Sequence, residues 1–122
     1  MAVPVFAFEV PVNERPVCPS RSRPIDLVHL ANQTMGDKAL EIEVLQMFAR
    51  QARKTLREMA ETDRAGIVAA AHRLKGSANS VGAFGVADVA TRIEEKGPEA
   101  VLLAKLSASV VEAENFILKL CR

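Results

Sequence analysis

The chain has 122 residues, 49% of them apolar and 25% charged, which is the size and composition of a single globular domain. Sixteen basic and fifteen acidic side chains give a formal net charge of +1. That charge is too small to favour nucleic acid or an anionic membrane surface as a partner. Tyr and Trp are absent and Phe occurs five times, so the composition favours packed aliphatic helices over a β-sandwich or a base-stacking surface.

The two cysteines, Cys18 and Cys121, lie near opposite ends of the chain, and no C-x-x-C pair or cluster of His is present. We therefore expect no disulfide scaffold and no metal site. Residues 1–12 contain no Lys or Arg and are interrupted by Pro4 and Pro11, which is unlike a signal peptide. No apolar run reaches the ~18 residues of a membrane span, so the expected location is the cytoplasm, without membrane insertion.

Residues 1–24 contain five of the six prolines, and proline inside a helix costs about 3 kcal/mol. This segment is therefore expected to form an extended N-terminal arm outside the folded domain. Its apolar first part, Val3 to Val10, would either remain an extended terminus or lie as a strap over the folded domain or over a partner.

From residue 25 onward the apolar residues recur at helical spacing. Asp26 is expected to cap a short leading helix that ends near Gln33, and Gly36 and Asp37 separate it from a long second helix. The buried seam of the second helix is predicted at Ile42, Leu45, Ala49, Ala52, Leu56 and Met59.

Three further helices follow. Asp63 is expected to cap a third helix that runs to about Ser80, and a fourth helix is predicted from about Phe84 to Lys96. The last helix has its predicted seam at Leu103, Leu106, Val110, Ala113, Ile117 and Leu120. Short connections place neighbouring amphipathic helices antiparallel. The predicted fold is therefore all-α: an antiparallel, up-down four-helix bundle with a short leading helix, over residues 25–122.

The third helix carries the residues with the clearest chemistry. Its buried stripe is predicted at Ile67, Ala71, Leu74, Ala78 and Val81, and His72 points about 140° away from the centre of that stripe, toward solvent. An exposed imidazole at neutral pH offers a nitrogen lone pair for attack on phosphorus. Lys75 can lie beside the oxygens of a bound phosphoryl group, and Gly76 leaves room for a docking partner. Val68, Ala69 and Asn79 share this face.

The fourth helix offers a partner for His72. Two antiparallel helices folded about Ala83 place His72 opposite Glu94, with Thr91 and Glu95 nearby. A carboxylate there would accept a hydrogen bond from one imidazole nitrogen and raise the nucleophilicity of the other. A slip of one residue would place Glu95 or Ile93 at this position instead.

Each of these residues also has an ordinary structural interpretation. A lone helical His is usually a solvated surface residue, and Lys75 and Glu94 would then be surface charges. Gly76 is harder to explain in this way, because glycine within a helix costs about 1 kcal/mol relative to alanine. His29, in the leading helix, has no accompanying motif and is assigned a structural role.

The segment His72-Arg73-Leu74-Lys75-Gly76-Ser77, with Gly82-Ala83 following, resembles the histidine-containing phosphotransfer (HPt) domains of bacterial phosphorelays. The resemblance extends from Ile25-Asp26-Leu27 through Leu30, Met47-Phe48 and Ile93-Glu94 to the last helix. It implies that His72 is phosphorylated, on Nε2, and exchanges the phosphoryl group with the aspartate of a response-regulator receiver domain or receives it from a sensor kinase.

The resemblance also assigns roles to the neighbouring residues. The family's lysine and glycine positions fall on Lys75 and Gly76, and its later glycine falls on Gly82. The expected binding residues are therefore Val68, Ala69, Gly76, Asn79, Gly82 and Thr91. Many members carry Gln where this chain has Glu94, which instead is similar to the glutamate of the chemotaxis-kinase version of the domain; Thr91 lies on the same side. The implied protein is a phosphocarrier without a kinase site and without a cofactor of its own, since Mg²⁺ would belong to the receiver. The oligomeric state is open, and one accessible His per chain suits a monomer.

Three other classes compete with this interpretation. A histidine-kinase dimerisation domain has an acidic residue after its His, whereas Arg73 follows here. A metal-binding bundle would need several inward-facing ligands, but the predicted seams are aliphatic. A non-catalytic interaction or inhibitory bundle with the same fold would be expected to lose His72 or Lys75, and both are present.

Overall fold

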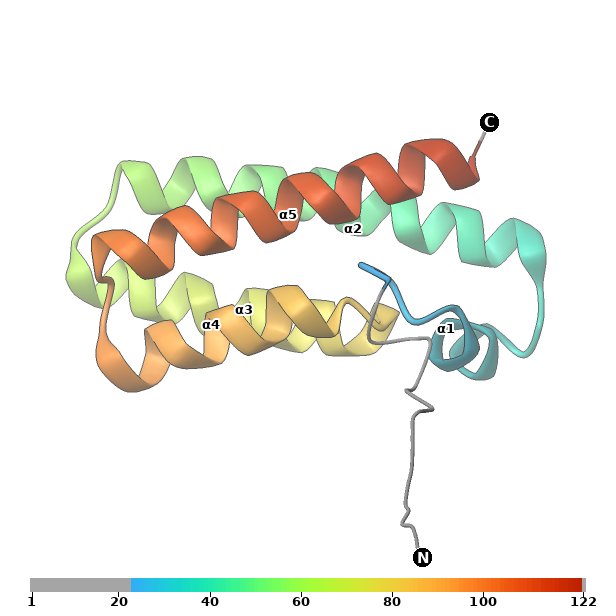
Figure 1. Cartoon of the computed structure of the whole chain (residues 1–122), viewed down its shortest axis with the longest axis horizontal. Helices are drawn as coiled ribbons and strands as arrows, with labels where there is room; N and C mark the ends of the chain where they lie inside the picture. Colours follow the sequence, from blue (N-terminus) through green and yellow to red (C-terminus); the bar gives the residue numbers. More distant parts are fainter. Residues whose placement is uncertain (1–22, 122) are drawn as a thin grey trace, which may run out of the picture.

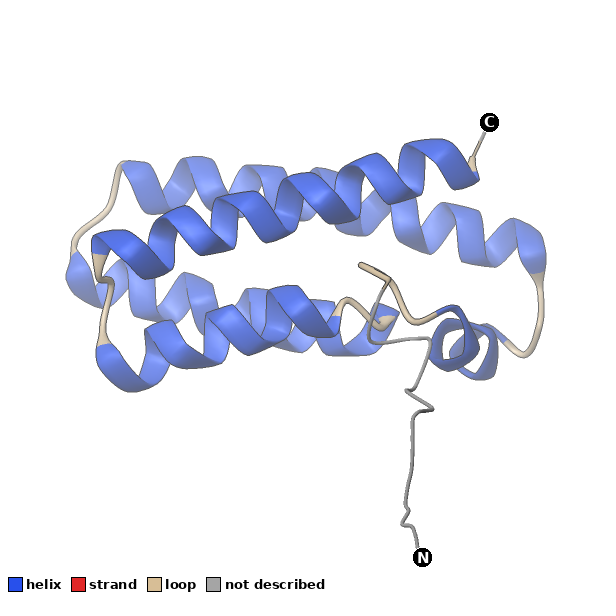
Figure 2. Cartoon of the chain, viewed as in Figure 1, coloured by secondary structure: helices blue, strands red, loops and turns tan. Residues whose placement is uncertain are grey.

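A computed structural model describes residues 23–121, and within that range every regular element is a helix (Figure 2). The five helices are α1 (Leu27–Thr34), α2 (Lys38–Ala60), α3 (Arg64–Val81), α4 (Phe84–Lys96) and α5 (Ala100–Leu120). The all-α class predicted from the sequence is confirmed. The predicted arm over residues 1–24 falls almost wholly outside the described residues.

Asp residues begin the first three helices, as their positions in the sequence predict. The Asp26 carboxylate accepts hydrogen bonds from the backbone N–H groups of Val28 and His29, both at 3.1 Å. Asp37 caps α2 and Asp63 caps α3 in the same manner. Each carboxylate satisfies backbone donors that have no partner within the helix and also favours the positive end of the helix dipole.

The four longer helices form a ring of contacts, in which α2 packs on α3, α3 on α4, α4 on α5 and α5 on α2. Figure 1 shows α2 and α5 in one layer and α3 and α4 in the other, with successive helices reversing direction. The short helix α1 packs against α2 and α3 near the start of α2. This arrangement leaves one side of α3 and α4 facing outward together.

Aliphatic side chains fill the space between the helices. The largest fully buried ones are Ile25, Leu30, Leu45, Leu74, Ile93, Leu106, Val86 and Val110. Burying a side chain of this size contributes about 1.5 to 3 kcal/mol. The core therefore extends back to Ile25, before the first helix, which ties the start of the described chain to the bundle.

Two residues of the predicted seams are exposed, so the seam predictions are wrong there. The core side of α2 repeats at Glu41, Leu45, Phe48, Ala52, Thr55 and Met59, which places Ile42 about 100° off this side. The hydrophobic pattern misses this register because two of the core positions are polar. In α5, Leu120 is the last residue and lies one turn beyond Ile117, the last buried position. At the start of the same helix Leu102 is buried, whereas Leu103, the predicted seam residue, is only partly buried.

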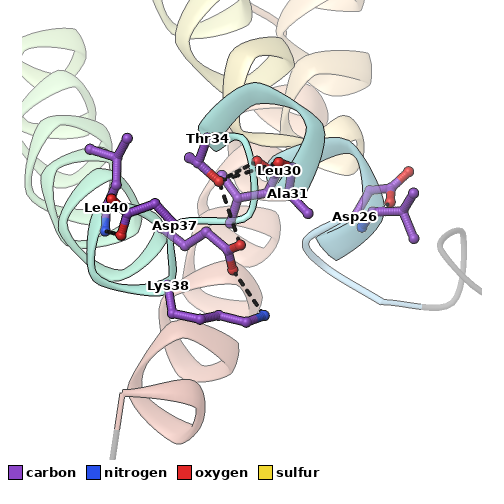
Figure 3. A network of polar contacts seen from close by, with 9 residues as sticks. Asp26, Leu30, Ala31, Thr34, Asp37, Lys38 and Leu40 are labelled. Atoms are coloured by element: carbon purple, nitrogen blue, oxygen red, sulfur yellow. Dashed lines mark hydrogen bonds and ion pairs between the residues drawn. The ribbon is translucent and has the colours of Figure 1, made fainter.

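Polar contacts compensate for the burial of Glu41 at the junction of α1 and α2. Figure 3 shows two of its partners, Thr34 and Lys38. The Thr34 hydroxyl donates to the carbonyl of Leu30 at 3.0 Å, and its oxygen lies 3.5 Å from Oε2 of Glu41. Nζ of Lys38 lies 3.5 Å from Oε1 of the same carboxylate. A buried carboxylate requires such partners, and these contacts couple the short helix to the start of α2.

Candidate functional site

His72 lies near the middle of α3, on the side that faces away from the core. The residues of α3 that are buried are Ala70, Ala71, Leu74, Ala78 and Val81. The side chain of His72 is 68% exposed. The exposure predicted from helical periodicity is therefore confirmed, and a partner macromolecule can reach the imidazole.

The imidazole of His72 contacts the carboxylate of Glu94, from the neighbouring helix α4. Nδ1 of His72 lies 2.7 Å from Oε2 of Glu94. The carboxylate is an acceptor only, so in a neutral imidazole the proton is on Nδ1 and the lone pair is on Nε2. Of the three residues that the sequence allowed at this position, the structure places Glu94 against His72, while Ile93 is buried and Glu95 is exposed.

Lys75 binds the other oxygen of the same carboxylate. Its Nζ lies 2.7 Å from Oε1 of Glu94, and that oxygen is shielded from solvent. The Glu94 side chain is only 20% exposed, so the lysine offsets the cost of placing a carboxylate there. The sequence prediction put Lys75 beside a phosphoryl group; in this structure its ammonium is held by Glu94.

This pairing changes the acidity of Glu94. The hydrogen bond from Lys75 holds the pKa of the Glu94 carboxyl below its usual range, with a smaller contribution from His72 in the same direction. Partial burial raises that pKa but does not outweigh the two hydrogen-bonding partners. Glu94 is therefore an anion, able to accept from Nδ1, throughout the neutral range.

The lowered pKa predicts how stability depends on pH. A carboxyl whose pKa is lower in the folded state stabilises the fold at any pH above its unfolded pKa of about 4.3, and this contribution is lost as the pH falls through the folded value. We expect the free energy of unfolding of wild type to exceed that of Glu94→Gln by about 1 kcal/mol at pH 6, and this difference to shrink as the pH falls below about 4.3. Urea unfolding of both proteins from pH 6 into the acid range measures the difference; a gap that does not shrink as the pH falls would contradict the ion-pair origin.

Small side chains surround the His72–Glu94–Lys75 cluster. Ala69 and Asn79 are exposed and Val68 is half-buried on α3. Gly76 is exposed, and a methyl group added there would meet no neighbouring atom within 4 Å. The side chains around His72 therefore project little from the helix surface, and a partner surface can approach the imidazole closely.

Thr91 lies one turn before Glu94 on α4 and is half-buried. Its hydroxyl donates to the carbonyl of Ala87 at 2.9 Å. That bond occupies the hydroxyl proton, so in this structure Thr91 lines the site without donating to His72 or Glu94.

Gly82 lies apart from this cluster, about 15 Å along the helix axis from His72. It ends α3 with φ +84°, and its carbonyl accepts a hydrogen bond of 2.9 Å from the N–H of Asp26. A Cβ atom at Gly82 would lie 2.8 Å from the backbone oxygen of Asp26. The resemblance had grouped Gly82 with the binding residues, whereas its position here joins the end of α3 to the start of α1.

An ion pair next to His72 was not anticipated from the sequence. Arg73 reaches across to α2, where its Nη2 lies 3.1 Å from Oε1 of Glu58. Helical spacing shows that Arg73 and His72 point in different directions, but the partner depends on how α2 packs on α3. No local pattern could have identified Glu58.

Residues 23–121 contain neither a cluster of metal ligands nor a helix fit to span a membrane. No group of three or more His, Cys, Asp or Glu side chains there is arranged to hold a metal ion. None of the helices of that range combines the length and apolar character that a bilayer crossing requires.

The comparison with protein-family models identifies the class. The model of the Hpt domain matches residues 43–117, more than half of the chain. This range contains His72, Lys75 and Glu94, together with most of α2, all of α3 and α4, and α5 as far as Ile117. The chain belongs to the Hpt domain family.

Hpt domains are phosphocarriers that take part in histidine phosphotransfer in phosphorelays, where they interact with response regulators and kinases. Neither a search of curated proteins nor a search of solved structures produced a significant match.

Proposed function

We propose that His72 is the phosphorylated residue of this Hpt domain and that it exchanges the phosphoryl group with the aspartate of a response-regulator receiver domain, or accepts it from a sensor kinase. The observation that carries the proposal is the tautomer of the exposed imidazole, with the proton on Nδ1 and the lone pair on Nε2. Nδ1 is engaged by Glu94 at 2.7 Å, and the ring is 68% exposed. Nε2 is thus the nitrogen with the lone pair.

The transfer step follows from this arrangement. The Nε2 lone pair attacks phosphorus in line, the N–P bond forms, and the P–O bond to the receiver aspartate breaks as that carboxylate departs. The imidazole becomes cationic because Nδ1 keeps its proton. The Glu94 carboxylate then faces a full positive charge instead of a dipole, so its hydrogen bond to Nδ1 strengthens as the reaction proceeds. The reverse sequence returns the phosphoryl group.

Lys75 has a second role in this proposal. In the unphosphorylated chain its ammonium is bound to Oε1 of Glu94. Once Glu94 is paired with a cationic imidazole, the lysine is less strongly held, and its long side chain can turn toward the dianionic phosphoryl oxygens. Lys75 would thereby neutralise charge on the phosphoryl group, while the receiver supplies its own carboxylates and Mg²⁺.

We infer that the functional unit comprises residues 25–122, with α2 to α5 as the antiparallel, up-down four-helix bundle of such a carrier. Ile25 is fully buried, which supports including α1 and the residues just before it. The receiver would dock over the low surface formed by Val68, Ala69, Gly76 and Asn79. One exposed His per chain suits a carrier that acts as a monomer.

The test uses the whole chain and a receiver domain phosphorylated on its aspartate. Transfer should produce one phosphoryl group per chain, with the acid lability and base stability of a phosphoramidate, mapped to His72 by mass spectrometry. Modification at any other residue, or no modification, would contradict the proposal.

Substitution of the two supporting residues tests their roles separately. Glu94→Ala leaves Nδ1 without its acceptor, so we expect phosphorylation to slow by roughly tenfold to a hundredfold. Glu94→Gln keeps an acceptor oxygen and should recover part of the rate. Lys75→Ala should slow transfer by a similar factor, since a charge close to the phosphoryl oxygens is removed.

Rapid-quench measurements of phosphoryl transfer provide these rates, with circular dichroism to establish that each variant is folded. Arg92→Ala is the matched control, because Arg92 lies on α4 in an exposed ion pair with Asp88. Wild-type rates in both Glu94→Ala and Lys75→Ala would show that the cluster has only a structural role.

A further inference from the structure

A groove runs between α2 and α5. Figure 1 shows these two helices in the layer of the bundle opposite to α3 and α4. Its volume is about 520 Å³. Residues from the middle of α2 form one wall and residues from the second half of α5 form the other. Since His72 lies on α3 and its partner Glu94 on α4, this groove is separate from the site described above.

The α5 wall is largely apolar, and Glu114 and Asn115 are its polar members. Val111 and Leu118 line it and are 43% and 62% exposed, although both are large aliphatic side chains. Ala49 and Ile117 contribute further apolar surface between the two helices. Exposed aliphatic residues gathered in a concave surface are typical of a binding site.

The α2 wall is basic. Arg50 and Arg53 line the groove. Arg57 lies just beyond the lining residues and follows Arg50 by two helical turns on the same face of α2. Arg53 is paired with Glu114, whose Oε2 lies 3.0 Å from its Nε. Arg50 and Arg57 form no ion pair with any carboxylate among residues 23–121. The wall therefore has positive charge that contacts within the described chain do not neutralise.

The two walls share one repeat distance. Val111 and Leu118 are seven residues apart on α5, and Arg50 and Arg57 are seven residues apart on α2. Seven residues of helix span about 10.5 Å. A third helix bound in the groove can therefore contact both pairs of residues along its length. Its apolar residues would repeat every seven positions on the side that faces α5, and its acidic residues would repeat every seven positions on the side that faces α2.

We propose that the α2/α5 groove binds an acidic amphipathic helix of a partner protein. Leucine-type side chains of that helix would pack against Val111 and Leu118, and Glu or Asp side chains on its flank would pair with Arg50 and Arg57. The groove would recognise a partner other than the one that contacts His72, and both could be bound at once.

The charge of the groove argues against two other occupants. In a symmetric dimer the same patch meets itself, so a second copy would bring two basic walls into one interface at a cost in repulsion. A membrane surface would have to fill a concave groove, and the apolar wall lacks the aromatic residues that anchor proteins at a bilayer interface. An acidic amphipathic helix can instead pack apolar side chains against α5 and pair its carboxylates with the arginines of α2.

The test is a titration of the full-length, ¹⁵N-labelled chain with a peptide of about three heptads. The peptide has Leu at the two groove-facing positions of each heptad and Glu at the flanking positions; a matched peptide has Lys in place of each Glu. We expect saturable amide shift changes along the α2/α5 groove, unchanged by His72→Gln, and much weaker binding of the Lys peptide. Because the unphosphorylated chain is used, failure here leaves the phosphotransfer proposal untouched.

Charge reversal provides the matched control. Arg50→Glu with Arg57→Glu should raise the Kd for the Glu peptide by roughly tenfold, and Leu118→Ser should weaken binding independently of charge. Lys105→Glu with Lys119→Glu makes the same change in net charge, at exposed positions of α5 outside the groove, and should leave the Kd unchanged. The proposal would be overturned if both double variants lost affinity equally or if the Glu and Lys peptides bound equally well. It would also be overturned if the chain self-associated through the groove, or bound phosphatidylserine vesicles in place of the peptide.

Discussion

Replacement of His72 by Gln is expected to abolish acceptance of a phosphoryl group while leaving the fold intact. The Gln amide nitrogen has no lone pair available for attack on phosphorus, so the substituted side chain cannot accept the phosphoryl group. The His72 side chain is 68% exposed, and a surface substitution of this type changes stability by no more than about 0.5 kcal/mol. Incubation with a phosphorylated receiver, followed by quantification of the labelled chain, measures the effect.

His29→Gln is the control for this experiment. His29 lies in α1, where its ring makes an edge-to-face contact with Phe84, with the ring centroids 5.2 Å apart. It is the only other His in the chain, and its replacement should leave phosphoryl acceptance at the wild-type level. Equal labelling of wild type and His72→Gln would instead show that another residue accepts the phosphoryl group. No labelling of wild type would favour a non-catalytic interaction bundle that retains the Hpt fold.

Replacement of Gly82 by Ala is expected to destabilise the fold by about 2 to 3 kcal/mol. Two effects combine at this position. A residue with a Cβ at φ +84° is strained, and the Cβ would lie 2.8 Å from the backbone oxygen of Asp26. Because the carbonyl of Gly82 accepts the N–H of Asp26, the two backbones cannot separate without breaking that bond.

Two further glycine substitutions separate these effects in urea unfolding. Gly36 has φ +79°, and a methyl group added there would meet no atom within 4 Å, so Gly36→Ala should cost only the backbone strain of about 1 kcal/mol. Gly76→Ala, in a helix with open space around it, should stabilise the fold by up to about 1 kcal/mol. Gly82→Ala should still accept a phosphoryl group when folded. Unchanged stability would contradict the structural role of Gly82, and loss of labelling in folded protein would assign Gly82 to the site.

The helix boundaries could be predicted because they depend on local chemistry. Asp26, Asp37 and Asp63 each precede a run of helical periodicity, and a carboxylate at that position binds backbone donors of its own first turn. Gly97 and Pro98 mark the end of α4 for an equally local reason, since neither continues a helix readily. No knowledge of the rest of the chain is required for these positions.

The seams were less predictable because they depend on what each helix packs against. Glu41 and Thr55 occupy core positions of α2 although both are polar. Thr55 satisfies its hydroxyl by donating to the carbonyl of Gln51 at 2.8 Å, and Glu41 has partners in Thr34 and Lys38. A prediction that counts only apolar residues therefore places the seam of α2 too close to Ile42, away from the core side that contains Glu41 and Thr55.

The sequence by itself determined the class of protein and the candidate phosphoryl acceptor. Periodicity within one helix is enough to show that His72 faces solvent while Ala71 and Leu74 face the core, since both properties depend only on 3.6 residues per turn. The order of residues around His72 and the short connection to the next helix were also enough to suggest Glu94 as its neighbour.

The tertiary structure decided how that neighbour is used. Lys75 and His72 bind different oxygens of one carboxylate, so the ammonium is held by Glu94 and the proton of the imidazole is directed to Nδ1. The same packing paired Arg73 with Glu58 and placed the apolar wall of α5 beside the basic wall of α2. Contacts of this kind join residues far apart in the chain, and their geometry depends on the relative position of whole helices, which no local pattern contains.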